Sequence, residues 1–89
     1  MEYKDASTWL MTFLERAEAA RWASIADVRR VYPHADAVKA SSGNDLIVFN
    51  ASGNNYRLIT ALHFNRAKLY ILRFMTHAEY DKGFWKDQL

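Results

Sequence analysis

The segment at residues 76–85, THAEYDKGFW, gathers side chains that can transfer protons or bind a phosphate, among them His77 and Tyr80. Cleavage of RNA by its own 2′-hydroxyl needs a base for that hydroxyl, a cation for the phosphorane and an acid for the leaving 5′-oxygen. Imidazole and phenol can exchange protons, and a guanidinium such as that of Arg57 can hold a phosphate. These residue types indicate phosphodiester chemistry, and the alternative is that His77 and Tyr80 are structural residues at a strand end.

Positive charge is concentrated in the second half of the chain. The net charge is only +2, and residues 1–43 hold six basic and six acidic side chains. Residues 50–78 contain no Asp or Glu. The cationic side chains of this segment are Arg57, Arg66, Lys68 and Arg73, joined by His63 and His77. An anionic partner would bind such a segment, and the alternative is that these cations only solubilise a sheet surface.

Length and composition limit the classes of protein to consider. A chain of 89 residues has room for one domain, here residues 1–89, with one site or interface. The absence of cysteine excludes disulfides and thiolate metal sites and favours the cytoplasm. His77, Glu79 and Asp81 alternate as on a strand but lack a matched partner pair, so no metal is expected. No apolar run approaches the roughly 18 residues of a membrane span, so no membrane association is expected.

Two helices are predicted in the N-terminal part. Apolar residues recur at helical spacing in the first, which should cover about residues 8–21. Its apolar positions are Trp9, Leu10, Phe13, Leu14, Ala17 and Ala20. Ser24 and Asp27 form a variant capping box that predicts a second helix up to about residue 31. Pro33 should end this helix, because a residue before proline is disfavoured in the helical region.

Extended segments follow the helices. Residues 46–49, 56–64 and 69–75 are rich in β-branched and aromatic residues, and residues 51–54 and 65–68 are typical of turns. The pattern predicts an α+β fold in which two N-terminal helices pack on a three-stranded antiparallel sheet.

The predicted second hairpin also gives a register. With Arg66 and Ala67 at its centre, Arg57 lies opposite Thr76 and close to His77, and His63 lies opposite Tyr70. The face that carries Arg57 should be the more open one. The reverse face should pack on the helices, and it carries Tyr56, Leu58, Leu62, Phe64, Leu69, Ile71 and Met75.

Several motifs resemble a known family in their order and spacing. Asn-x-Tyr-Arg-Leu contains Arg57, Thr-His-x-x-Tyr-Asp contains His77 and Tyr80, and the likeness extends back through Trp22 and the segment at residues 26–36. The chain resembles the HigB-type toxins of bacterial toxin–antitoxin modules. The resemblance implies a RelE-like fold and a metal-independent mRNA interferase, an endoribonuclease that cleaves messenger RNA on the translating ribosome. It also implies a helix-turn-helix antitoxin, HigA-like, as partner, and no cofactor.

The resemblance also assigns roles to individual residues. It implies catalytic roles for Arg57, His77 and Tyr80. It implies RNA contacts from four further cations, namely Arg66, Lys68, Arg73 and Lys82. Many relatives place an arginine where this chain has Leu72, and because one step along a strand reverses the side chain, Arg73 should point away from the Arg57 face.

A different function is also compatible with the sequence. Relatives commonly begin with a strand and a short helix ahead of the segment that starts here near Trp9, and the sequence does not predict them. The chain could therefore be a shortened, non-catalytic toxin relative that only binds an antitoxin or RNA through its basic face. Aromatic residues such as Tyr70 and Phe74 would then receive the partner.

Overall fold

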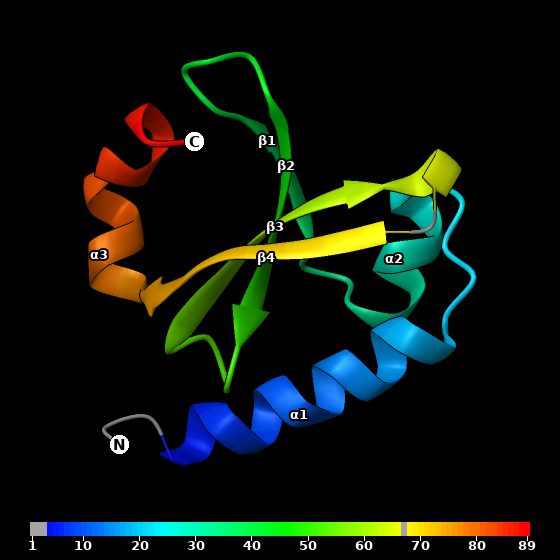
Figure 1. The fold of residues 1–89 in the computed structure, drawn as a ribbon. Coiled ribbons are helices and arrows are strands. Elements are labelled where there is room, and N and C mark those ends of the chain that lie inside the picture. The colour runs from blue at the N-terminus through cyan, green and yellow to red at the C-terminus, as the bar shows by residue number, and fades with distance from the viewer. Residues whose placement is uncertain (1–3, 67) are drawn as a thin grey trace.

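The fold is a four-stranded antiparallel sheet with helices on both faces (Figure 1). The computed structural model describes residues 4–66 and 68–89. In chain order the elements are α1 (Lys4–Ala19), α2 (Ile25–Val31), β1 (Asp36–Lys39), β2 (Asp45–Ala51), β3 (Tyr56–His63), the 3₁₀ helix η1 (Phe64–Arg66), β4 (Lys68–Thr76), α3 (His77–Lys82) and the 3₁₀ helix η2 (Phe84–Asp87). The strands lie side by side in the order β1-β2-β3-β4. The α+β class is confirmed, and the prediction of three strands is wrong.

The two predicted N-terminal helices are present with shifted ends. Helix α1 begins at Lys4 and ends at Ala19, so it starts about one turn before the predicted position. Ser24 is the N-cap of α2 but makes no side-chain cap bond. Instead the Asp27 carboxylate accepts a hydrogen bond from the backbone N–H of Ala23, the residue before the N-cap, at 2.9 Å, so the predicted capping box does not form. Helix α2 ends before Pro33, as predicted.

Strand β1 is the strand that the sequence pattern did not predict. It has four residues, of which only Val38 is even partly buried. So short and exposed a strand has no apolar alternation to detect. Its pairing with β2 places Asp36 opposite Val48, so Asn50 of β2 lies beyond its start.

The predicted register between β3 and β4 is wrong. Arg57 lies opposite Met75 rather than Thr76, and His63 lies opposite Lys68 rather than Tyr70. Ala67, half of the predicted turn centre, lies outside the described residues. The hairpin turns through η1, and an irregularity between Ile59 and Thr60 shifts the pairing by one residue along the strands. Such a bulge inserts an extra residue into one strand and redirects the side chains beyond it.

The bulge changes which residues of β4 share a face with Arg57. Arg73 pairs with Ile59, and Ile59 is two residues from Arg57 on the same strand. Because directly opposed residues point to the same side of a sheet, Arg73 faces the same way as Arg57, and the prediction that it points away is wrong. Met75, expected on the helix side, packs in the opposite cluster, and Phe74 takes its place against the N-terminal helices.

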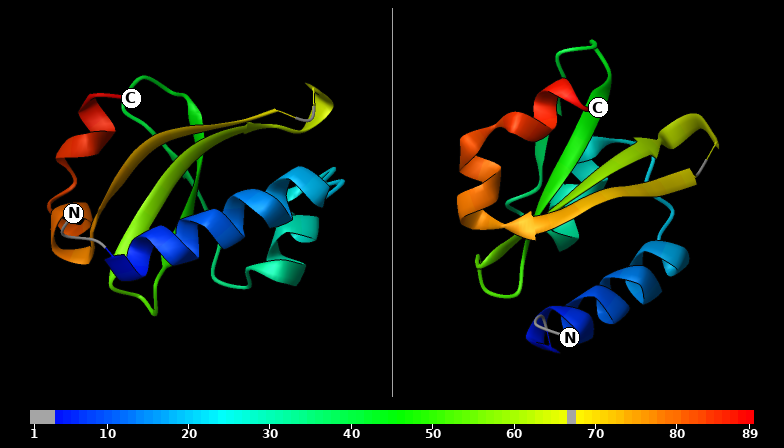
Figure 2. Two further views of the ribbon diagram at one scale, coloured as in Figure 1. Left: turned by 60° about the horizontal axis from the view of Figure 1, so that its bottom comes forward. Right: turned by 60° about the vertical axis from the view of Figure 1, so that its left-hand side comes forward.

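Helical segments lie on both sides of the sheet (Figure 2), and each face of the sheet carries its own hydrophobic core. Residues of α1, α2 and one face of the sheet form the first cluster, which consists of Phe13, Val28, Ala35, Ile47, Phe49 and Leu58. The second cluster lies beneath the C-terminal segment and consists of Ala40, Leu46, Val48, Ile59 and Trp85. The expectation that the Arg57 face stays open is therefore wrong, because η2 covers part of it.

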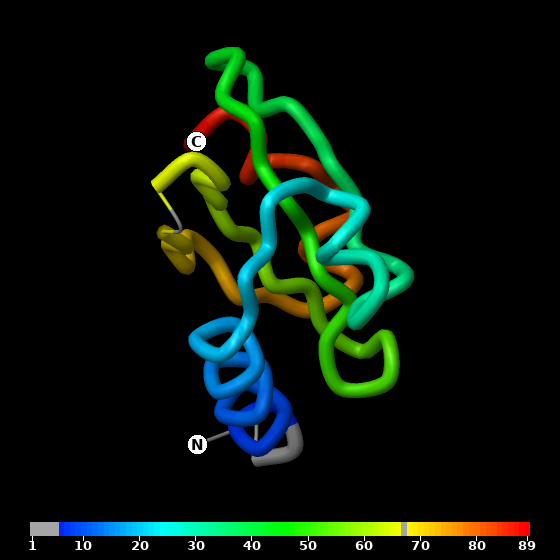
Figure 3. The backbone as a smooth tube through the Cα atoms, turned by 90° about the vertical axis from the view of Figure 1, so that its right-hand side faces the viewer, coloured from blue at the N-terminus to red at the C-terminus, as the bar shows by residue number. Residues whose placement is uncertain are grey.

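The segment after β4 is a helix rather than an alternating strand. Thr76 and Glu79 form a complete capping box for α3, and Gly83 ends it in the left-handed conformation with φ 75°. The chain then returns to the β1–β2 hairpin, where the Asn44 side chain donates to the Leu89 carbonyl oxygen at 2.8 Å. Figure 3 shows the C-terminal end beside this hairpin, far from α1.

Candidate active site

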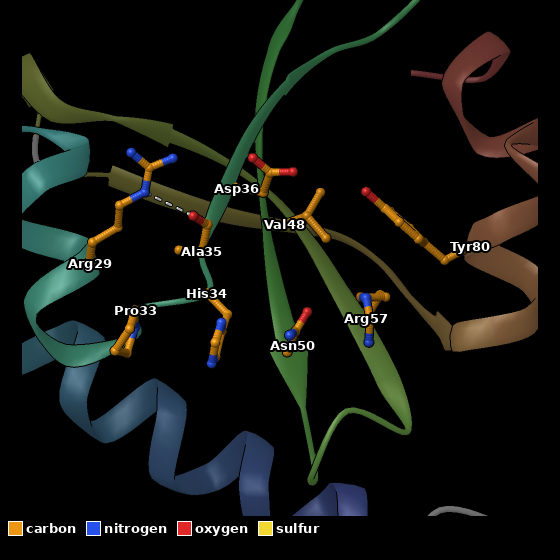
Figure 4. A pocket seen from close by; sticks show the side chains of 9 residues that line it. All are labelled: Arg29, Pro33, His34, Ala35, Asp36, Val48, Asn50, Arg57 and Tyr80. Carbon is orange, nitrogen blue, oxygen red and sulfur yellow. Dashed lines mark hydrogen bonds between the residues drawn. The ribbon is translucent and has the colours of Figure 1, made fainter.

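A pocket of about 420 Å³ lies on the Arg57 face, where β1 begins and β2 ends (Figure 4). It exists because β1 starts only opposite Val48, which leaves the β2 edge at Asn50 open beside the α2–β1 connection. The residues that line it are Arg29, Pro33, His34, Ala35, Asp36, Val48, Asn50, Arg57 and Tyr80. Helix α2, the following loop, three strands and α3 therefore all contribute to one hollow.

Arg57 is buried, with 8% of its surface exposed, and is held in place by the β2–β3 turn. Its Nη1 donates to the carbonyl oxygens of Asn54 at 3.1 Å and Tyr56 at 3.0 Å. Ser52, Gly53 and Asn54 all have positive φ in this turn. Arg57 also lines the pocket, and no buried side-chain nitrogen or oxygen in the described part of the chain lacks a partner.

Tyr80 lies beside Arg57 in the pocket and contacts its guanidinium (Figure 4). The Arg57 guanidinium carbon lies 5.6 Å from the centre of the Tyr80 ring, within the range of a cation–π interaction. The ring stacks on Trp85, with centroids 5.1 Å apart and planes at 16°. The Trp85 Nε1 also donates to the Tyr80 carbonyl oxygen at 3.0 Å. These contacts fix the phenol, whose oxygen points into the pocket on the side of Asp36 and Val48 (Figure 4).

The surroundings of Tyr80 favour its protonated form. Burial raises the pKa of the phenol above its ordinary value, and the negative charge of Asp36 and, more weakly, that of Asp81 raise it further against the opposing effect of Arg57. The phenol is therefore neutral at physiological pH. It can donate a proton to an oxygen bound in the pocket, and it is a poor base.

Four polar residues of the pocket were not predicted to belong to a site. They are Arg29, His34, Asp36 and Asn50. The Arg29 Nε donates to the Ala35 carbonyl oxygen at 3.0 Å, which fixes the arginine beside the loop. His34 is exposed, and its imidazole is available to a ligand. The sequence signals were that the segment at residues 26–36 and Asn50 both contribute to the family resemblance, and strand β1, which places that segment beside Arg57, was not predicted.

His77 does not line this pocket. It is the first residue of α3, and its Nδ1 lies 2.8 Å from the Asp81 carboxylate one turn later. Its backbone N–H donates to the Asn55 carbonyl oxygen at 3.0 Å. The structure thus brings two of the three predicted catalytic side chains together, Arg57 and Tyr80, and places the His77 imidazole against the Asp81 carboxylate on α3.

The four predicted RNA-binding cations occupy two other regions. Arg66 and Lys68 lie at the tip of the β3–β4 hairpin, at the opposite end of these strands from α3 (Figure 1). Arg73 and Lys82 line a second hollow of about 400 Å³ between β4 and the C-terminal segment. Within residues 4–66 and 68–89, no group of three or more His, Cys, Asp or Glu could hold a metal ion.

Comparison with known proteins gives a match to one protein family. The family model, described as HigB_toxin, the RelE-like toxic component of a toxin–antitoxin system, matches residues 6–83. The match covers most of the 89 residues and every residue that lines the pocket. A search of curated proteins found no match. No helix in the described part of the chain has the length and apolarity to cross a membrane.

Proposed function

The chain belongs to the HigB toxin family, the RelE-like toxic components of toxin–antitoxin systems, and we propose that it is an endoribonuclease that cleaves messenger RNA on the translating ribosome. The observation that carries this proposal is the pocket lined by Arg57, whose guanidinium is fixed by the β2–β3 turn and lies against Tyr80. A buried, immobile guanidinium costs no reorganisation when charge develops on a phosphate. Its neighbours in the pocket supply the proton-transfer groups that the reaction needs.

The proposed reaction is transesterification by the RNA itself. The 2′-oxygen attacks phosphorus while the His34 imidazole accepts its proton, and Arg57 stabilises the charge on the phosphorane. The P–O5′ bond breaks, and the Tyr80 phenol donates its proton to the leaving 5′-oxygen. The products are a 2′,3′-cyclic phosphate and a 5′-hydroxyl, and no metal or organic cofactor takes part. His77, paired with Asp81 on the same helix as Tyr80, is a positioning residue in this mechanism.

The remaining parts of the function concern partners. Arg66 and Lys68 at the hairpin tip, with Arg73 and Lys82 beside α3, would contact the phosphates of the RNA on either side of the pocket. Membership of the family implies an antitoxin partner. We propose that this antitoxin is a helix-turn-helix protein of the HigA kind and that the toxin acts in the cytoplasm, where messenger RNA is translated.

Induction in bacterial cells tests the proposal. The parent chain should arrest growth, and primer extension should show discrete cuts within translated codons. Arg57→Ala should abolish both because it removes the fixed cation, whereas Arg16→Ala, an exposed change on α1, should leave both intact. Circular dichroism would establish that both variants fold. Growth arrest without cleavage, or cleavage that survives Arg57→Ala in a folded protein, would reject the proposed activity or its site.

A further inference from the structure

The second hollow exposes an aromatic ring that the fold does not use. Phe84 is 70% exposed, and no other large hydrophobic side chain in the described part of the chain is as exposed. Its neighbour Trp85 is 3% exposed and belongs to the core. Gly83, in the left-handed conformation, ends α3 and begins η2, so the chain turns between these aromatic residues and the rest of the helix. A single exposed hydrophobic residue is ordinary on a protein surface, so its surroundings decide whether it marks a binding site.

Two cations lie in the same hollow as Phe84. The hollow is lined by Arg73, Met75, Glu79, Lys82, Phe84 and Trp85, among others. The Arg73 Nη1 donates to the Leu72 carbonyl oxygen at 2.7 Å, which restricts the position of its head group. Within the described residues, neither Arg73 nor Lys82 has a carboxylate within ion-pair distance. Their charge is therefore available to an anion.

The one acidic residue of the hollow is engaged elsewhere. A single carboxylate oxygen of Glu79, Oε1, accepts from the Thr76 backbone N–H at 3.1 Å and from the Thr76 hydroxyl at 3.0 Å. These hydrogen bonds are the main reason that the pKa of Glu79 is lowered, and Lys82 contributes a smaller effect. Glu79 thus serves the helix cap and reduces, without cancelling, the positive potential of the hollow.

We propose that this hollow is a second RNA subsite, in which a base stacks on Phe84 while Arg73 and Lys82 hold an adjoining phosphate. Aromatic faces beside cations are the usual means of binding single-stranded RNA with little dependence on sequence. The inference rests on the proposed function, since it places a neighbouring nucleotide of the same RNA. Trp85 connects the two hollows. It lines the second hollow, and its ring stacks on Tyr80, which lines the first.

Binding of an uncleavable oligonucleotide tests the subsite. The probe is a single-stranded 2′-O-methyl RNA, which lacks the attacking hydroxyl, and its affinity for the purified chain is measured at low salt. Phe84→Ala should weaken binding about tenfold, because loss of one stacked base has an effect of this size. Met11→Ala is the matched control, since Met11 is 65% exposed on α1, away from the hollow, and should leave the affinity unchanged.

Abasic probes distinguish stacking from a general loss of binding. When one base is removed at each position in turn, a single position should weaken binding to the parent about as much as Phe84→Ala does. At that position the abasic probe and Phe84→Ala should not add, because both remove the same contact. Arg73→Ala and Lys82→Ala should each reduce the slope of log affinity against log salt by about 0.7, the loss of one phosphate contact on a single strand.

The inference is overturned if Phe84→Ala binds as tightly as the parent, if no abasic position couples to Phe84, or if the parent does not bind the probe. None of these results bears on whether messenger RNA is cut, which is measured by primer extension and depends on Arg57. Conversely, loss of Arg57-dependent cleavage would reject the proposed function while leaving the measured coupling at Phe84 as it stands.

Discussion

The two faces of the sheet differ in what they pack: one carries an aromatic core, and the other carries a core and a polar pocket. On the face of α1 and α2, rings of Phe13, Tyr32 and Phe49 meet with centroids 4.7–5.4 Å apart. On the face of α3 and η2, Tyr80 and Trp85 also stack, but their cluster ends at a buried arginine and an open pocket. We expect the first face to contribute most of the stability, and the second holds polar groups that packing alone does not require.

The difference shows how a thin domain accommodates a site. A chain of 89 residues buries little apolar surface, so a polar site on both faces of the sheet would leave too small a hydrophobic core. Here one face packs mainly apolar side chains against α1 and α2, and the other is covered by two short helical segments, α3 and η2. Polar residues from α2, β1, β2 and β3 therefore remain accessible beside Tyr80. Variants on the two faces should separate stability from activity.

The largest effect is expected on the aromatic face. Phe13→Ala removes a fully buried ring that contacts Trp9, Tyr32 and Phe49, and the cavity should cost about 3–5 kcal/mol of the free energy of unfolding. Urea denaturation followed by circular dichroism measures it. A loss below about 1 kcal/mol would show that this face is not the main source of stability.

The next effect separates the two histidines. His34→Ala should lower the single-turnover rate of RNA cleavage by about 100-fold, because it removes the proposed base from the pocket. His77→Ala should lower it only about threefold, since the imidazole acts on the site indirectly, through an exposed contact with Asp81 on α3. His77→Gln, which can still hydrogen-bond to Asp81, should restore most of that loss. The reverse order of the two effects would place the catalytic imidazole on α3.

The pH dependence of cleavage tests the role of Tyr80. Burial and Asp36 raise the pKa of the phenol, so the protonated acid should persist and the rate should fall only above the ordinary pKa of tyrosine. Asp36→Asn removes a charge that raises this pKa, so the alkaline limb should move to lower pH. The limb should disappear in Tyr80→Phe, which keeps the ring stacked on Trp85. A limb unchanged in both variants would show that another group titrates.

The smallest effect concerns the cap of α3. Thr76→Ala removes the side-chain part of the capping box and should cost about 1 kcal/mol of the free energy of unfolding. Because the cap lowers the pKa of Glu79, its stabilisation is present above the ordinary pKa of glutamate and is lost as the pH falls through the lowered value. The difference in urea midpoint between parent and variant should therefore shrink in acid. A difference in urea midpoint that is constant with pH would show that the Glu79 carboxylate does not contribute to the stabilising effect of the cap.

The sequence predicts the elements that have strong local signals. Strands β2, β3 and β4 and helix α2 were recognised from β-branched runs, turn residues and Pro33. Strand β1 was missed because a four-residue edge strand lacks a period. Helix α3 was missed although Thr76 and Glu79 have capping-box spacing, because His77, Glu79 and Asp81 also alternate as on a strand.

The site was harder to predict than the elements. The sequence predicted that cross-strand pairing with Thr76 brings Arg57 close to the segment that follows. In the structure Arg57 pairs with Met75, and the turn into α3 brings Tyr80 against the guanidinium. His34 and Asp36 depend on the unpredicted strand β1. The orientation of Arg73 depends on the bulge in the β3–β4 pairing. The run of β-branched and apolar residues in these strands does not indicate where a bulge occurs.

The chemistry of the cut RNA ends tests the central claim most directly. A defined messenger RNA on ribosomes is treated with the purified chain, and the new ends are identified by mass spectrometry, with Arg57→Ala as the comparison. Transesterification in the Arg57–Tyr80 pocket predicts 2′,3′-cyclic phosphate and 5′-hydroxyl ends that are absent with Arg57→Ala. Ends that carry a 3′-hydroxyl and a 5′-phosphate, or cyclic phosphate ends that persist with Arg57→Ala, would contradict it.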